Sequence, residues 1–481
     1  MSQPTPRISY TAPRSQIWAW GVGGIANHIL ICTYGQATAI FTIGFSLNAA
    51  LVSWAIMLPR LIDGITDPIL GHLSDNTHTR WGRRKPFLLL GATLAAFALA
   101  ALWWADRDWP PSAQLAYLFV LGTVFYCSWG LYSMAWNSIG YELTDDYHER
   151  SKISAIGSFF LSIVLLGNSW IYWFALRPFF GNEINGIRWI AGGVAVVAIV
   201  TAVVATIVCK ERFTHVNASK PRVAIFPAIK TTIKNSAFRS LVLIKVCQTL
   251  GERAAGGILF FVAIYYVCQG DKSLATKITG IGGVVGTIWG FASLPLVKPI
   301  SRWLGKKGGL ILGAGGSLAA ALITPFAYSP ANPYWMLFPA IMVVLLISIS
   351  NTIANAIMPD ICDVDELESG QRREGLFTAV MGFVQKIEIS LCALLVGYLV
   401  VWSGLDTKVA IQPDWVLNRL FWLAVLPNIV FTSGYFILAL RFPLTEGAMM
   451  EVRRRLDERH RAAVASTSSP DAASGKPLGV G

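Results

Sequence analysis

Charged residues are scarce in this chain: Asp, Glu, Lys and Arg make up 14% of its 481 residues, against about a quarter in typical soluble domains. Its seven cysteines are scattered and form no CxxC pair, which argues against a zinc site or a disulfide scaffold. The six histidines occur in no HExxH motif, which argues against a metalloprotease. We therefore expect a protein that is not an enzyme and that holds no cofactor.

Long apolar segments are what the chain has instead. Hydrophobic residues make up 54% of the sequence, and the mean hydropathy is +0.54. A helix that crosses a bilayer needs about 20 mostly apolar residues. Twelve segments meet this requirement: 16–43, 47–73, 86–106, 113–143, 153–176, 188–210, 237–269, 275–300, 308–329, 333–359, 375–403 and 413–441. The sequence predicts an all-α, multi-pass integral membrane protein with twelve transmembrane helices.

The basic residues that give the net charge of +12 lie between these segments. They cluster after the second, fourth, sixth, eighth and twelfth segments, all on one side of the membrane. Positive loops stay on the cytoplasmic side, so both termini are expected to be cytoplasmic, in an inner or plasma membrane. The excess of Lys and Arg over Asp and Glu thus indicates contact with membrane lipid, and no nucleic-acid partner is expected.

Two loops indicate that the chain is an internal duplication. Arg80-Trp-Gly-Arg-Arg-Lys85 and Arg302-Trp-Leu-Gly-Lys-Lys307 lie 222 residues apart, and the loops that end at Arg150 and Arg373 lie 223 apart. Two six-helix pseudo-repeats of this kind are typical of the major facilitator fold. The expected division is a cytoplasmic N-terminus (1–15), an N-terminal half (16–210), a linker (211–236), a C-terminal half (237–441) and a largely disordered cytoplasmic tail (442–481).

Three charges stand on one face of the second segment. Arg60, Asp63 and Asp67 are spaced i, i+3 and i+7, so they share a helical stripe. Ionisable groups in a membrane tend to be functional and to face an aqueous cavity. One interpretation is a structural ion pair of Arg60 with a carboxylate. The other is a site for a proton or a monovalent cation, since one arginine neutralises only one of the two carboxylates.

The run from Arg60 to Pro86, with Asp360-Ile-Cys-Asp-Val-Asp-Glu-Leu and the loop 142–150, resembles the glycoside–pentoside–hexuronide:cation symporters. This is the melibiose-permease-like branch of the major facilitator superfamily. The resemblance implies symport of a sugar, glycoside or uronide-like solute with Na⁺ or H⁺ by alternating access. It also implies that Asp63 and Asp67 bind the coupling cation, with Na⁺ possible there. Lys386 matches a lysine near both the cation and the sugar sites.

The chain departs from the sugar-transporting members where they contact sugar. A Lys-Asp pair in the first helix becomes Asn27-His28, and two further sugar-binding positions fall on Ser133 and Ser158. These residues are therefore candidate contacts of a different solute. The alternative cargo is a lysophospholipid or another amphiphile, because lysophospholipid carriers similar to this family keep the helix-two acids and have a less polar pocket.

Other candidate solute contacts follow from their residue types. The fourth segment offers aromatic and polar side chains that would suit a sugar ring, with ordinary helix packing as the alternative; these are Trp129, Tyr132, Ser133, Trp136 and Asn137. Glu252 and Arg253 stand near the centre of the seventh segment, about 100° apart, so each is expected to meet a different helix or the cavity. A structural role for this pair is the alternative.

Opposite charges occupy matching loops of the two repeats. They are Asp75, Arg83, Arg84 and Arg150 in the first half, and Asp360, Asp363, Arg372 and Arg373 in the second. Ion pairs between the halves would form a cytoplasmic gate that holds the outward-facing state and breaks when the halves rock. The alternative is ordinary positive-inside topology with solvated carboxylates.

Overall fold

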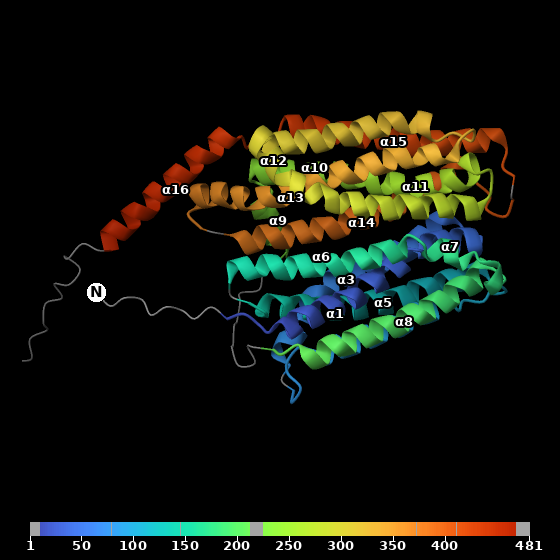
Figure 1. The fold of residues 1–481 in the computed structure, drawn as a ribbon, viewed down its shortest axis with the longest axis horizontal. Helices are drawn as coiled ribbons and strands as arrows, with labels where there is room; N and C mark the ends of the chain where they lie inside the picture. The colour runs from blue at the N-terminus through green and yellow to red at the C-terminus, as the bar shows by residue number, and fades with distance from the viewer. Residues whose placement is uncertain are drawn as a thin grey trace, which may run out of the picture.

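The computed structural model describes residues 10–77, 79–144, 146–211, 225–371, 373–409 and 411–467. Its helices form two layers, one for each half of the chain (Figure 1). The N-terminal half comprises α1 (Arg14–Tyr34), α3 (Ala49–Asn76), α4 (Lys85–Leu102), α5 (Pro111–Glu142), α6 (Tyr147–Asn168) and α8 (Glu183–Val208), with the short α2 (Ala37–Ala39), η1 (Ile40–Gly44), α7 (Ile171–Ala175) and η2 (Pro178–Phe180). Buried apolar side chains within each half form its core.

The C-terminal half is built of longer and more interrupted helices. It comprises α9 (Ile225–Thr232), α10 (Ser236–Thr249), η3 (Leu250–Ala254), α11 (Ala255–Val262), η4 (Ala263–Val267), α12 (Lys272–Ala327), η5 (Pro333–Met336), α13 (Leu337–Ser369), α14 (Glu374–Ser403) and α15 (Asp414–Leu440). The π-helical turns η3 and η4 continue α10 and α11 into one predicted span, 237–269.

The helices agree with the twelve predicted spans. Ten helices of the described chain are long and apolar enough to cross a membrane. One of them, the 56-residue α12, is two helices that meet at Gly305, whose backbone (φ 68°, ψ 174°) is not helical. Positive φ is easily adopted only by glycine. With this division and the 21-residue α1, the predicted segments each have a helix.

The first predicted segment, 16–43, is not one continuous helix. Helix α1 ends at Tyr34, and the chain passes through α2 and the π-helical η1 before α3 begins. Asn48 caps α3, where its side-chain oxygen accepts hydrogen bonds from the amides of Ala50 (3.0 Å) and Leu51 (3.2 Å). Capping satisfies amides that lack a partner in the helix. It thereby fixes the start of the helix that carries Asp63.

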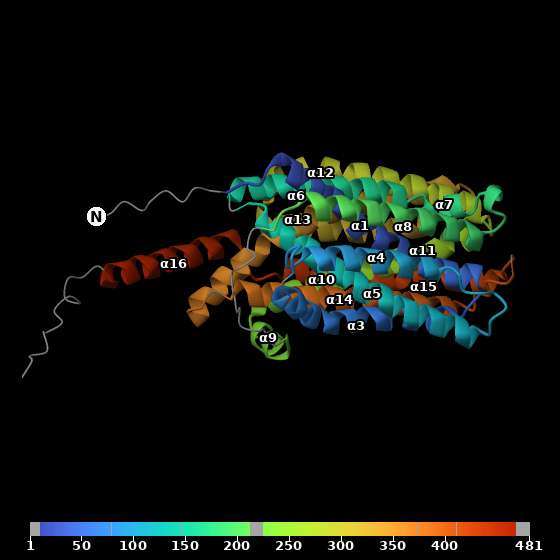
Figure 2. The ribbon, with the colours of Figure 1, turned by 90° about the horizontal axis from the view of Figure 1, so that it is seen from below.

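The two halves meet along α3 with α14 and along α6 with α12. Figure 2 shows α9 and α16 at one end of the bundle and α7 at the other, where glycines bring the two halves close together. There a Cβ on Gly397 would lie 2.1 Å from Ser53 Oγ, and one on Gly283 would lie 2.1 Å from Ser169 Oγ. Such distances are too short for any side chain, so glycine allows this close approach.

Hydrogen bonds between described residues reinforce the same end. They are Lys272–Glu183 (3.0 Å), Arg177–Ser273 (2.8 Å), Thr407 to the carbonyl of Thr42 (3.1 Å) and Trp54–Tyr398 (3.1 Å). The end near α7 is therefore closed.

The expectation of a largely disordered tail is wrong for residues 446–467, which form helix α16 (Glu446–Thr467). Two features explain the helix. Glu451 pairs with Arg454 and Arg455 at i+3 and i+4 spacing, which supports a helix. Arg453 also donates to Asp360 of α13 at 2.9 Å, which ties the helix to the bundle. Residues 468–481 lie outside the described chain.

Candidate functional site

An ion pair joins the two halves in the middle of the bundle. Lys386 Nζ on α14 donates to Asp63 Oδ2 on α3 at 2.8 Å. The Asp63 side chain is 2% exposed and that of Lys386 is 26% exposed. A carboxylate that deep in a bilayer needs a positive partner or a proton. The structure thus brings together two of the residues predicted for coupling.

Arg60 lies one turn before Asp63 and contacts a different helix. Its Nη1 donates a long hydrogen bond to Tyr126 Oη of α5 at 3.5 Å, and its guanidinium lies 5.8 Å from the centre of the Tyr126 ring. Asp63 thus pairs with Lys386, and Arg60 contacts Tyr126. The side chain of Asp67 lies outside the described part of the structure, so its cation-binding role stays a prediction.

A central cavity of about 440 Å³ opens beside this pair, between the halves. Arg60 and Tyr126 line it from the N-terminal half, and Arg253 lines it from η3. Its walls are otherwise mostly apolar, with a few polar groups such as Gln36 and Ser390. Small-molecule sites typically have this composition and a volume of roughly 300 to 1,000 Å³.

A second cavity, of about 530 Å³, lies within the C-terminal half between α10, η3, α13 and α14. The π-helical η3 carries Glu252 and Arg253, and such turns are frequent at functional sites. Glu252 accepts a hydrogen bond from Ser317 of α12 at 3.0 Å, and Arg253 lines both cavities. Both residues line this cavity; Glu252 also contacts α12, and Arg253 also lines the central cavity.

Two other charged residues of this second cavity were not among the predicted site residues. Lys245 donates to Asn351 at 2.5 Å and to Gln248 at 3.3 Å. Glu388 is 4% exposed and accepts a hydrogen bond from Thr249 at 2.8 Å. Both carry the signal that identified Glu252, a charge within an apolar segment. Their convergence from α10 and α14 could not be read from the sequence.

The predicted aromatic contacts of α5 pack against α1 instead of facing a cavity. Trp136 stacks on Trp20 with ring centroids 4.7 Å apart. Each indole donates to the other residue's carbonyl, at 2.9 and 3.0 Å. Tyr132 is fully buried and donates to the carbonyl of Gly23 at 2.7 Å. Helix packing, the alternative named for this segment, therefore corrects the prediction that Tyr132 and Trp136 contact solute.

The other candidates of the N-terminal half are divided between packing and exposure. Trp129 Nε1 donates to the carbonyl of Asn27 at 2.8 Å, and His28 meets the Trp136 ring edge-on at 5.8 Å. Asn137 is exposed and donates back to the carbonyl of Ser133 at 2.8 Å. Ser158 is also exposed, and donates to the carbonyl of Ser154 at 3.0 Å. None of these residues lines either of the two cavities described above.

Five of the six predicted gate residues whose side chains the structure describes form ion pairs within their own halves. Arg83 and Arg84 both pair with Glu142 of α5. Asp360 pairs with Lys306 (2.5 Å) and with Arg453. Arg150 is exposed, and the side chains of Asp75 and Arg372 lie outside the described residues.

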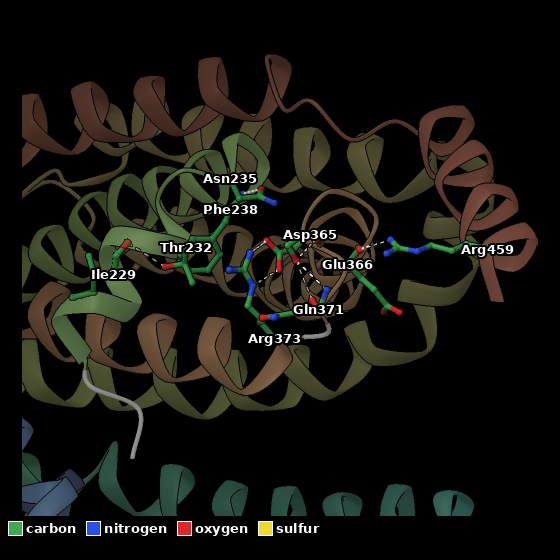
Figure 3. Close-up of polar contacts among 10 residues, drawn as sticks. Ile229, Thr232, Asn235, Phe238, Asp365, Glu366, Gln371, Arg373 and Arg459 are labelled. Carbon is green, nitrogen blue, oxygen red and sulfur yellow. Dashed lines mark hydrogen bonds and ion pairs between the residues drawn. The ribbon is translucent and has the colours of Figure 1, made fainter. Parts of the chain in front are cut away.

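Arg373 and Asp365 form the best-defined pair at this end (Figure 3). The guanidinium donates two hydrogen bonds to the carboxylate, at 2.9 and 2.6 Å, and they raise the pKa of Arg373 above its usual value. Asp363 reaches Arg453 at 3.9 Å. In this state Arg83, Arg84, Asp360, Asp363 and Arg373 thus pair within their own halves. A latch between the halves stays a prediction for the opposite state.

Comparison with known proteins identifies the family. Residues 19–446 match the model of the MFS/sugar transport protein family. The chain belongs to this family. It is a multi-pass membrane transporter with the major facilitator fold and not an enzyme, as the sequence predicted. The match also agrees with the resemblance to glycoside–pentoside–hexuronide:cation symporters, and it favours a sugar-type cargo over a lysophospholipid.

Individual relatives span nearly the whole transporter. An uncharacterized symporter of Synechocystis is 24% identical over 86% of this chain and 91% of its own length. A glucuronide carrier protein homolog of Escherichia coli is 20% identical over 92% and 96%. The crystal structure of a D-xylose-proton symporter superposes with a TM-score of 0.57 at 16% identity, over 88% of this chain and 96% of that one; it shows the shared fold.

Proposed function

We propose that this transporter couples the entry of a cation, Na⁺ or H⁺, to that of a sugar-type solute through the Asp63–Lys386 pair. The observation that carries the proposal is that this pair spans the interface between the halves, with a nearly buried carboxylate. A contact that joins the two halves differs between the states of a rocking transporter. It is therefore where an ion can act on the conformational equilibrium.

The physical argument is competition for one carboxylate. Removing one partner of a buried ion pair is strongly destabilising, because the other charge is left in a poorly solvating environment. A cation that binds Asp63 neutralises it and releases Lys386, whereas in its absence Lys386 takes that place. The free energy of the contact between the halves thus depends on whether a cation is bound to Asp63. Because this contact differs between the inward- and outward-facing states, cation binding shifts the equilibrium between them, as coupling requires. Asp67 and Arg60, one turn to either side, complete the proposed ion site.

The orientation follows from the basic loops. With them in the cytoplasm, the end that carries α9 and α16 is cytoplasmic, as are both termini, and the closed end near α7 is external. The structure then represents an inward-facing state. The gate pairs of Asp75, Arg83, Arg84 and Arg150 with Asp360, Asp363, Arg372 and Arg373 belong to the outward-facing state. We place the protein in an inner or plasma membrane, surrounded by lipid, with no nucleic-acid partner.

The solute class rests on the family and on the cavities. Sugar transport is the description of the family, and one relative is named for a glucuronide. The cavities of about 440 and 530 Å³ are of the size that holds a small molecule. We propose a sugar, glycoside or uronide as the solute.

The test is uptake into proteoliposomes under imposed Na⁺ or H⁺ gradients, with a panel of pentoses, hexoses, glycosides and uronides. The wild type is expected to accumulate at least one of them above its external concentration with one of the two gradients. Asp63→Asn is expected to lose accumulation and to keep counterflow. Glu149→Gln also turns a carboxylate into an amide, in an exposed i,i+3 pair with Lys152 in the first turns of α6, and should behave as the wild type. Concentrative uptake by Asp63→Asn would refute the coupling role.

A further inference from the structure

The aromatic residues of α5 that were predicted to contact solute use their polar groups in packing within the N-terminal half. Trp136 and Trp20 hydrogen-bond to each other's backbone, Tyr132 to Gly23, and Trp129 to Asn27. These bonds fix α1 against α5. A solute that used the same donors would have to break the packing of two spanning helices.

In the cavity of the C-terminal half, by contrast, one carboxylate oxygen has no hydrogen-bond donor among the described residues. Of the two carboxylate oxygens of the nearly buried Glu388, Oε2 accepts from Thr249, while Oε1 is buried and has no hydrogen-bond partner among the described residues. A buried carboxylate oxygen without a donor costs free energy. Since Glu388 lines the cavity, a donor supplied by a bound molecule would remove that cost.

The rest of the lining offers hydrogen-bonding groups of both kinds. Acceptors come from Glu252 and Glu388, donors from Lys245 and Arg253, and both from the amides of Asn351 and Asn355. Lys245 and Arg253 are close enough to interact electrostatically with each of the two acids. Two acids and two bases leave the cavity with no net formal charge. It therefore suits neither a bare cation nor an anionic lipid headgroup.

We infer that this cavity, between α10, η3, α13 and α14, is the subsite that binds the ring hydroxyls of the solute, so that recognition resides in the C-terminal half. Neighbouring hydroxyls donate to the carboxylate of Glu388 in charge-assisted hydrogen bonds, which are stronger than neutral ones. Lys245 and the amides donate to hydroxyl oxygens. The inference rests on the proposed function and assigns the site of that function.

This location would also couple solute binding energetically to ion binding. Arg253 lines both the central cavity and the subsite, so the subsite adjoins the space between the halves. Glu388 and Lys386 stand two residues apart on α14. Solute bound to one and Asp63 bound to the other act on the same helix, whose contact with α3 joins the halves.

The experiment measures binding to the full-length protein in nanodiscs. The probes are 4-nitrophenyl glycosides and hexuronides, with free pentoses and hexoses as competitors. For the member that the wild type binds best, Glu388→Gln and Asn355→Ala are each expected to raise Kd about tenfold or more, as the loss of a charge-assisted or well-formed hydrogen bond predicts. Asn27→Ala, Asn137→Ala and the control Glu149→Gln at the start of α6 should stay within about threefold, the range of a lost surface contact.

The outcomes separate the two proposals. Loss of affinity in the N-terminal variants only would overturn this subsite and leave the proposed function standing. Unchanged affinity in Glu388→Gln together with lost ion dependence of uptake would also overturn it, since Glu388 would then serve coupling. No binding of any panel member by the wild type would overturn both. Asn355 is exposed, so its variant decides the question if Glu388→Gln does not fold, as judged by melting temperature.

Discussion

The Asp63–Lys386 pair predicts an unusual pattern of stabilities in a double-mutant cycle. Asp63→Asn leaves an ammonium without its carboxylate, and Lys386→Met leaves the carboxylate of Asp63 buried without its ammonium. A fully buried pair loses about 3–5 kcal/mol when one partner is removed. Because the Lys386 side chain is 26% exposed, water screens part of this effect, and about 2–3 kcal/mol is expected for each single variant.

The double variant removes both charges and should be less destabilised than the sum of the two. The expected interaction energy is about 2 kcal/mol, well above the roughly 0.5 kcal/mol within which independent sites add. The assay is thermal melting in detergent without Na⁺ at a pH near 8. Lys152→Met, which removes an exposed lysine from its pair with Glu149, serves as the control and should change little.

The same cycle tests competition between lysine and cation. If Lys386 occupies the place of the ion, Lys386→Met removes the competitor. The rise in melting temperature on adding Na⁺, or on lowering pH for a proton, should then be larger than in the wild type, because a ligand stabilises by RT ln(1 + [L]/Kd). Additive single variants, or a Lys386→Met variant with no ion-dependent stabilisation, would show that the reasoning is wrong.

Three further predictions concern other parts of the structure. Gly397→Val should open the closed end, since its side chain would meet Ser53; a cysteine placed in the central cavity should then react faster with an impermeant reagent added at that end, and an unchanged rate would contradict this. Trp136→Ala removes the stack on Trp20 and should lower the free energy of unfolding by about 3–5 kcal/mol, seen as a lower melting temperature, while solute affinity stays within about threefold. A large loss of affinity at unchanged stability would contradict this prediction. Asp360→Asn should release α16 from its ion pair and speed trypsin cleavage there, whereas equal cleavage rates would show that other contacts hold the helix.

Much of the fold was predictable because a bilayer imposes it. Apolar segments of about 20 residues must form helices there, and the repeated basic loops indicated two halves. Asp63 could be identified for the same reason: a charge in hydrocarbon is too costly to be present without a role. The break at Gly305 falls in the predicted loop between segments 275–300 and 308–329. The break at Gly35–Gln36 was less visible, since glycine is also common inside membrane helices.

The sequence by itself determined the number of helices, their grouping into two halves and the charged positions within them, because hydrophobic length and charge cost act on each segment separately. Only the tertiary structure decided which charges meet. Lys386 and Asp63 lie 323 residues apart in the chain, and their contact depends on how α3 packs against α14. The same packing directs Trp136 into the contact with α1 and Glu388 into the cavity, because a side chain's partners are set by neighbouring helices and not by its own segment.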